Sequence, residues 1–154
     1  MKIKKVTWNN RKKCFSLATS KGILEFPYSL LHPKPSSQDE IKKAYSDAEI
    51  GKEAFTYLLQ SGKEGTVHID QVLEYNQDTD YLREALLYKL TLKAQSLLKE
   101  KKLSARAIMR RMHTSPTQFY RLLDQTNYNK SIDQMAKLLA ALDCYVDVVF
   151  KKAA

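Results

Sequence analysis

Apolar residues recur at helical spacing on both sides of a short polar break in residues 103–124, LSARAIMRRMHTSPTQFYRLLD. The positions that would share one helix face are Ile108, Met109 and Met112 before the break and Phe119, Leu122 and Leu123 after it. Ser104 and Ser115 precede the two stripes, and a serine hydroxyl at such a position can accept a hydrogen bond from a free N–H group of the first helical turn. The pattern predicts two short helices joined by a tight turn at 113–115.

Two further helices are predicted around this pair. Residues 81–101 carry apolar side chains three and four positions apart, namely Leu86, Leu87, Leu90, Ala94, Leu97 and Leu98. Residues 132–142 repeat the pattern behind a capping residue, Ser131, with Met135, Leu138, Leu139 and Leu142 on one face. We expect these helices and the central pair to cover the same small core.

The N-terminal half alternates apolar and polar residues in short runs. Residues 3–9, 13–18 and 22–28 predict a three-stranded meander with turn signals between the strands. The prolines of HPKPSS at 32–37 predict a loop or crossover. Residues 41–45 would add a strand, and 55–59 with 66–69 a hairpin around a turn at 61–65. The segment 38–60 also has helical propensity, but Gly51 and its β-favouring neighbours favour strands. Residues 70–80 are polar and turn-rich.

The chain ends in a β-prone run, residues 145–150, which predicts a terminal strand. Such a strand must pair with the N-terminal sheet or with another subunit, because its backbone groups need partners. The elements together predict an α+β fold with two domains. Residues 1–80 would form a small, mainly antiparallel β domain that dimerises or senses, and residues 81–154 an all-helical domain with a C-terminal strand. With 154 residues, 44% of them hydrophobic, the chain can bury a sizeable core.

Positive charge is concentrated in the C-terminal half. Residues 1–80 carry 12 Lys and Arg against 11 Asp and Glu, whereas residues 81–154 carry 14 against 6. Residues 99–130 alone hold eight basic and two acidic side chains. This distribution favours a polyanionic partner at the two-helix stretch. The alternative is that Lys99, Lys101 and Lys102 merely solvate a helix end.

The second short helix is predicted to turn a polar face outward. Its apolar residues must be buried, which leaves Thr117, Gln118, Tyr120, Arg121 and Asp124 on the opposite side. Side chains of this size and chemistry can read base edges in a DNA major groove.

Patterns of catalysis and metal binding are missing from the sequence. It has no phosphate-cradling Gly-rich loop, HExxH pair, GxSxG elbow or zinc-like Cys/His cluster. We therefore expect no enzyme, no cofactor and no metal, and an isolated His68 that packs in or on a strand. Cys14 and Cys144 favour reduced thiols, with a structural pair as the alternative. Without a signal peptide or an apolar run of membrane-spanning length, a soluble cytoplasmic protein with no membrane contact is expected.

Residues 90–142 resemble the five-helix DNA-binding domain of the phage-repressor (Xre/Cro-like) helix-turn-helix family. The segment LSARAIMRRMHTSPTQFYRLLD matches the spacing of that motif helix for helix. The chain differs from the family in having His113 where Gly is common in the turn, Ala105 where Gln is common, and Met109 where a small residue usually lies. Residues 41–89 are similar to an uncharacterised bacterial domain that precedes such a motif in small presumed regulators.

The resemblance and the polar face together predict a sequence-specific transcriptional regulator. It would bind double-stranded DNA as a homodimer, with half-sites about one DNA turn apart. The recognition helix would run over residues 116–123, beginning at Pro116; Thr117, Gln118 and Arg121 would reach base edges, and Tyr120 would lean on a sugar or base. The residues expected to hold phosphates are Arg106, Arg110, Arg111, Ser115, Asn129 and Lys130.

The competing interpretation is a protein-interaction module. An antitoxin-like neutraliser would place its sheet or terminal strand in the groove of a partner such as a toxin, with DNA binding weak or secondary. The helical pair would then serve protein contacts. Both activities are compatible within one chain.

Overall fold

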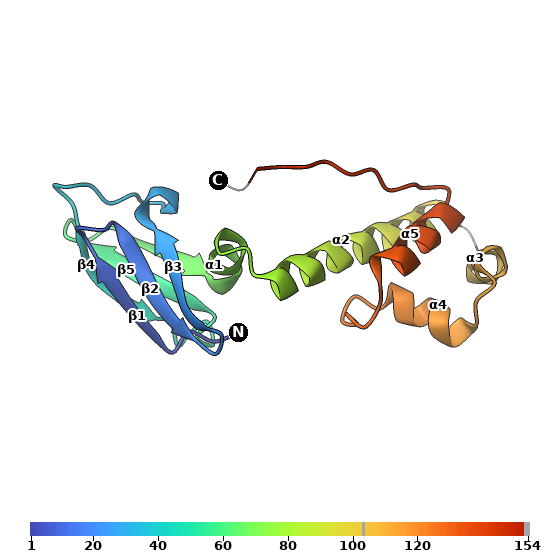
Figure 1. The fold of residues 1–154 in the computed structure, drawn as a ribbon, viewed down its shortest axis with the longest axis horizontal. Helices are drawn as coiled ribbons and strands as arrows, with labels where there is room; N and C mark the ends of the chain where they lie inside the picture. Colours follow the sequence, from blue (N-terminus) through green and yellow to red (C-terminus); the bar gives the residue numbers. More distant parts are fainter. Residues whose placement is uncertain (103, 153–154) are drawn as a thin grey trace. The chain divides into compact units, whose positions relative to one another are not determined.

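The computed structural model describes residues 1–102 and 104–152 (Figure 1). The chain divides after Tyr81 into two compact units, called unit 1 and unit 2 below. Within the described residues, unit 1 contains six strands and the short helix α1, and the helices that follow build unit 2. The fold is α+β with strands first and helices after them, which confirms the predicted class.

The first three strands form an antiparallel sheet in the order β1-β2-β3. They span Lys5–Asn9, Cys14–Thr19 and Gly22–Pro27, close to the predicted ranges. Buried and half-exposed residues alternate along the central strand β2, as expected for a strand with one face on a core. The β1–β2 turn is closed by the side-chain oxygen of Asn9, which accepts hydrogen bonds from the backbone N–H groups of Arg11 and Lys12 at 3.0 and 2.9 Å.

The second antiparallel sheet has the order β4-β5-β6 and comprises Ile41–Ser46, Ala54–Leu59 and Glu64–His68. Strands, and not a helix, therefore occupy the segment 38–60. Gly65 of β6 pairs with Tyr57 of the central strand β5. A Cβ atom at residue 65 would collide with the Tyr57 hydroxyl and lie 2.8 Å from the carbonyl oxygen of His32. The hairpin keeps this register because residue 65 has no side chain.

Aromatic side chains from both sheets meet in the core of unit 1. The ring of Phe15 in β2 lies 4.8 Å from that of Phe55 and 5.9 Å from that of Tyr57, centroid to centroid. Phe26 of β3 also contacts the Phe55 ring edge-on, at 6.3 Å. Tilted and edge-on pairs of this kind add to the free energy gained by burying the rings.

The helix α1, Ile69–Tyr75, lies where the sequence was expected to form polar turns. Its N-cap is His68, whose Nδ1 accepts a hydrogen bond from the backbone N–H of Asp70 at 3.3 Å. The side-chain oxygen of Gln71 accepts a hydrogen bond from the backbone N–H of His68 at 3.1 Å, which completes a capping box. His68 therefore ends β6 and starts a helix.

Unit 2 consists of α2 (Thr79–Glu100, with its first turn in unit 1), α3 (Ala105–Met112), α4 (Pro116–Leu123) and α5 (Ile132–Ala141) (Figure 1). Its buried core residues are Leu87, Ala94, Leu97, Ile108, Phe119, Leu122, Met135, Leu138, Leu139 and Leu142. All of them belong to the predicted apolar stripes. No helix of the described residues is both long and apolar enough to cross a membrane.

The predicted terminal strand does not form within the described part of the chain, and its pairing with another subunit stays a prediction. Residues 145–152 follow α5 without pairing to any strand in the described part of the chain. The large apolar side chains of this tail are exposed, from 42% for Val146 to 93% for Phe150. A high β-propensity measures how well a residue fits a pleated neighbour, and none of the strands that the structure describes lies beside this run.

Candidate nucleic-acid interface

The turn between α3 and α4 has a defined geometry. Ser104 begins α3 by accepting a hydrogen bond from the N–H of Ala107 at 3.0 Å, and Ser115 begins α4 by accepting one from Gln118 at 3.3 Å. His113 ends α3 in the left-handed conformation, with φ 52° and ψ 44°. Glycine adopts this conformation without steric cost, and histidine is among the residues that tolerate it. The chain therefore reverses at His113, and both serines act as the predicted caps.

The apolar side of the α3–α4 pair is anchored in the core of unit 2. Ile108 and Phe119 are completely buried, and Leu122 is 5% exposed. They belong to the same cluster as Met135 and Leu138 of α5. Burying one large apolar side chain contributes about 1.5–3 kcal/mol. With Phe119 and Leu122 both buried, α4 cannot rotate freely, so the side of the helix that faces the solvent is set.

The exposed side of α4 is polar. Thr117, Gln118 and Arg121 are exposed, and Tyr120 exposes 57% of its surface. The Tyr120 ring packs edge-on against the buried Phe119 ring at 5.3 Å, which holds its position on the helix. No acidic residue lies within the helix itself. The predicted reading face is therefore at the surface.

Arg121 contacts the loop that follows α4. Its Nη2 donates a hydrogen bond to the carbonyl oxygen of Asn129 at 3.0 Å, and the side-chain amide of Asn127 donates to the carbonyl oxygen of Arg121 at 3.1 Å. Asp124 accepts bonds from the hydroxyl and the N–H of Thr126, which lower the pKa of its carboxyl below the ordinary value. The loop of residues 124–131 is thus tied to the end of α4 by its own polar groups.

The predicted phosphate contacts on α3 fall into two groups. Arg106 and Arg110 are exposed, and neither forms an ion pair within the described residues. Arg111 instead donates to the carbonyl oxygen of Ala141 at 2.9 Å and lies 3.4 Å from the Asp143 carboxylate. Arg111 therefore joins α3 to the end of α5, and only part of its guanidinium is open to a ligand.

Lys130, which was expected to contact a phosphate, is buried in unit 2. Only 5% of its surface is exposed, and its Nζ donates hydrogen bonds to the Thr91 hydroxyl at 2.6 Å and to the carbonyl oxygens of Leu122 and Asp124 at 2.8 and 2.9 Å. Burial lowers the pKa of this amine below its ordinary value. An ammonium with three buried acceptors does not reach a phosphate, so Lys130 leaves the set of contact residues. Asn129, beside it, is exposed.

Protein-family models, curated proteins and solved structures contain no match to this chain. Any function of the α3–α4 pair must therefore be inferred from its geometry, exposure and charge. Among the residues with a defined structure, no cluster of His, Cys, Asp or Glu could hold a metal ion. The chemistry that the pair offers is that of exposed guanidinium, amide and hydroxyl groups on two capped helices.

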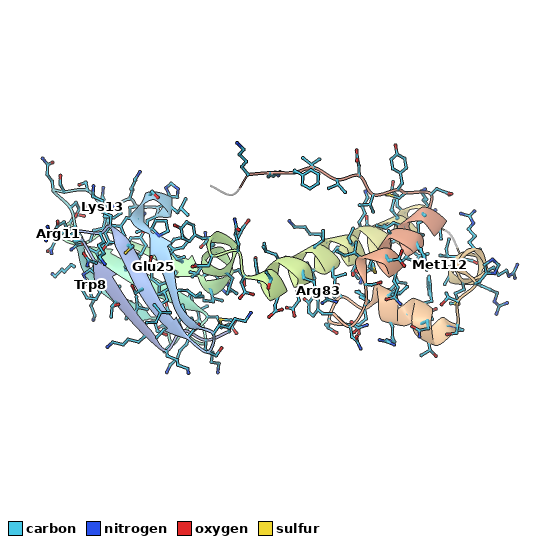
Figure 2. The ribbon with its side chains drawn as sticks, in the orientation of Figure 1. Trp8, Arg11, Lys13, Glu25, Arg83 and Met112 are labelled. Carbon is cyan, nitrogen blue, oxygen red and sulfur yellow. The ribbon has the colours of Figure 1, made fainter. Side chains whose placement is uncertain are left out.

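Two residues of α2 that the sequence does not single out support this surface. Arg83, labelled in Figure 2, donates through Nη2 to the carbonyl oxygens of Tyr128 and Lys130 at 3.1 and 2.9 Å. Gln95 donates to the carbonyl oxygen of Leu123 at 2.6 Å. Thr91 and Gln95 are polar residues four apart inside an apolar stripe, and that interruption is a signal in the sequence for the contacts of Thr91 and Gln95, whereas the contacts of Arg83 have none.

Proposed function

We propose that this chain is a sequence-specific DNA-binding transcriptional regulator that places α4 in the major groove. The observation that carries the proposal is the exposed row of Thr117, Gln118, Tyr120 and Arg121 on a helix whose other side is locked into the core. An α-helix fits the width of the major groove, where base edges present distinct patterns of donors and acceptors. A short, capped helix with a polar outer face has the form of a recognition helix.

The side chains on α4 match particular base edges. Arginine can donate two hydrogen bonds to guanine, and glutamine can pair with adenine. Gln118 and Arg121 are three residues apart, so they are neighbours on one face of the helix. Each such bidentate contact contributes about 1–3 kcal/mol of discrimination against a wrong base.

The first helix of the pair supplies charge for the DNA backbone. In motifs of this geometry the first helix crosses the phosphates while the second enters the groove. Arg106 and Arg110 are exposed on α3, and Arg111 keeps part of its guanidinium exposed. The N-terminus of α4 adds its own partial positive charge near Ser115. These contacts would set register and affinity without reading sequence.

Regulators of this type commonly act as two-fold dimers, and we propose a homodimer here, with half-sites about one helical turn of DNA apart. Unit 1, with its own core, is the proposed dimerisation or sensing part. Size-exclusion chromatography with light scattering measures the mass of the free protein and of its DNA complex. A single protomer on each selected site would contradict the dimer.

A protein-interaction module is the second candidate, and one observation favours it. The tail of residues 145–152 exposes apolar side chains and pairs with no strand that the structure describes, so another protein's sheet edge could accept it as an added strand. Co-expression with a candidate toxin and recovery of a stoichiometric complex would support this function. Loss of that complex on removing residues 145–154 would place the contact in the tail.

Selection of bound sites from random DNA tests the leading proposal. The full chain should enrich a defined motif, and anisotropy titrations should then show tighter binding to that motif than to random duplex. Gln118→Ala should lose roughly five- to a hundredfold in affinity for the motif. Gln60→Ala, which removes an exposed glutamine of unit 1, is the matched control and should change nothing. Failure to enrich any motif would overturn sequence-specific binding.

A further inference from the structure

Unit 1 contains a cavity of about 400 Å³. It lies between the β1–β2 turn, the short 3₁₀ turn Tyr28–Leu30 after β3, and the loop that leads to β4. Its lining includes Asn10, Lys13, Tyr28, Lys34, Ser36 and Glu40. Figure 2 shows Lys13 on the same end of unit 1 as Arg11. A cavity of this volume matches the size of a small-molecule site.

The floor of the cavity is fixed by hydrogen bonds. The Tyr28 hydroxyl donates to the side-chain oxygen of Asn10 at 2.9 Å, and the amide nitrogen of Asn10 donates to the carbonyl oxygen of Ile41 at 3.0 Å. The backbone N–H of Tyr28 also donates to the carbonyl oxygen of Lys13 at 2.9 Å. Burial raises the pKa of Tyr28 to about 12, so its hydroxyl stays a donor. Asn10 in the β1–β2 turn is therefore bonded both to Tyr28 and to Ile41 at the start of β4.

The loop that forms the opposite wall is also held in place. The Tyr57 hydroxyl donates to the carbonyl oxygen of Pro33 at 2.7 Å. Ser36 and Asp39 exchange backbone hydrogen bonds at 3.1 and 3.2 Å, and the Asp39 carboxylate accepts bonds from the N–H and hydroxyl of Ser61 at 2.8 and 2.7 Å. The cavity is thus preformed, which reduces the entropy that a ligand must overcome on binding.

Three charged side chains line this cavity without a partner. Lys13, Lys34 and Glu40 form no ion pair with any residue that the structure describes. Lys13 ends the β1–β2 turn in the left-handed conformation, with φ 56°, as the last residue of a short hairpin loop often does. These two cations and one anion are exposed at the cavity and are complementary to a ligand that carries both signs of charge.

We propose that this cavity binds a small zwitterionic metabolite of the amino-acid type, with its carboxylate or phosphate held by Lys13 and Lys34 and its amino group by Glu40. The serine hydroxyls of the loop can complete the hydrogen bonding of the acidic group. Ammonium–carboxylate pairs with charged hydrogen bonds are the strongest polar contacts available to such a ligand. The site lies wholly in unit 1 and does not depend on the proposed DNA binding.

Amide chemical shifts of the full-length chain test the site directly. L-Glutamate and O-phospho-L-serine are the two probes, so that a carboxylate and a phosphate are compared, and glutarate is the control because it lacks the amino group. At least one probe should shift the signals of residues 10–13 and 34–40 saturably, with a Kd of about 1 mM or tighter. Glutarate should bind at least about tenfold more weakly, the value of one lost ionic contact.

Variants separate the two ends of the ligand. Lys34→Ala should weaken the better probe by about tenfold or more, and Glu40→Gln should remove the preference for glutamate over glutarate. Lys5→Ala, an exposed lysine of β1 outside the cavity, is the matched control and should leave binding unchanged. The proposal is overturned if neither probe moves these signals, if glutarate binds as well as glutamate, or if Lys34→Ala has no effect.

Discussion

Lys130→Met removes the buried ammonium of unit 2 while keeping most of the aliphatic stem. The ammonium donates to one hydroxyl and two backbone carbonyls, those of Leu122 and Asp124 at the end of α4. Leaving a buried acceptor without a donor costs about 1–3 kcal/mol, and removing a poorly solvated charge returns part of that cost. We expect a net loss of about 2 kcal/mol in the free energy of unfolding at neutral pH.

The assay can separate the two units. Urea unfolding followed by circular dichroism at 222 nm reports mainly on the helices, whereas fluorescence reports on Trp8 of β1, the only tryptophan in the chain. With a slope of about 1–3 kcal/mol per molar urea, a loss of about 2 kcal/mol lowers the helical midpoint by roughly 1 M. The urea midpoint measured by Trp8 fluorescence should stay unchanged if the two units unfold independently. Lys137→Met, which breaks an exposed ion pair with Asp133, should cost at most about 0.5 kcal/mol.

The pH dependence gives a second test of Lys130. Burial lowers the pKa of its amine in the folded chain, so the unfolded chain binds more protons between that lowered pKa and the ordinary value of 10.5. Stability therefore rises with pH through this window and is lost as pH falls through the folded pKa. The gap between the wild type and Lys130→Met should widen in that window. A methionine variant as stable as the wild type at every pH would refute the reasoning.

The remaining predictions concern DNA contacts and packing. Arg121→Ala should weaken binding to a selected site by roughly ten- to a hundredfold while sparing random DNA, whereas Arg110→Ala should weaken both alike in anisotropy titrations; equal losses for Arg121→Ala would make it a phosphate contact. Log affinity should fall against log salt with a slope of about −3 if the three arginines of α3 contact phosphates in one protomer, and of roughly −5 to −6 if both protomers of a homodimer do so; a flat response would contradict DNA binding. Gly65→Ala should cost about 1–3 kcal/mol, read from Trp8 fluorescence in urea, because the added Cβ meets the Tyr57 hydroxyl; an unchanged midpoint would show that the ring can move. Removing residues 145–154 should leave the melting temperature within about 2 °C, because residues 145–152 pair with no strand among those described, and a larger drop would reveal contacts of the tail.

Helices and strands could be predicted where the pattern that produces them is local. The apolar stripes of α4 and α5 begin just after serine caps, and both signals lie within a few residues of each other. The missed helix α1 also had local signals, since Ile69, Val72 and Leu73 are spaced for one helix face and Gln71 completes the cap of His68. Its short length and polar neighbours concealed it.

The errors and omissions at the candidate interface come from partners that are distant in the sequence. Lys130 looks like a solvated cation until Thr91, 39 residues earlier, is placed beside it. The terminal run 145–150 has the composition of a strand, but a strand exists only with a neighbour, and composition does not supply one. Arg121 was predicted to be exposed and to contact a base edge. The sequence did not predict its hydrogen bond to Asn129, because that bond depends on a loop conformation that no periodic pattern encodes.

That bond between Arg121 and the loop bears on how selectivity could be tuned. A long side chain that is already held in one rotamer loses less conformational entropy on binding. For a flexible residue this entropy loss costs about 0.5–1.5 kcal/mol of binding free energy. The Gln118 side chain forms no such hydrogen bond with any residue that the structure describes, so the two residues proposed to read bases would enter the groove with different degrees of preorganisation. Substitutions in residues 124–131 could then sharpen or relax the choice of base without touching the nucleic acid, and the loop would act as a remote adjustment of specificity.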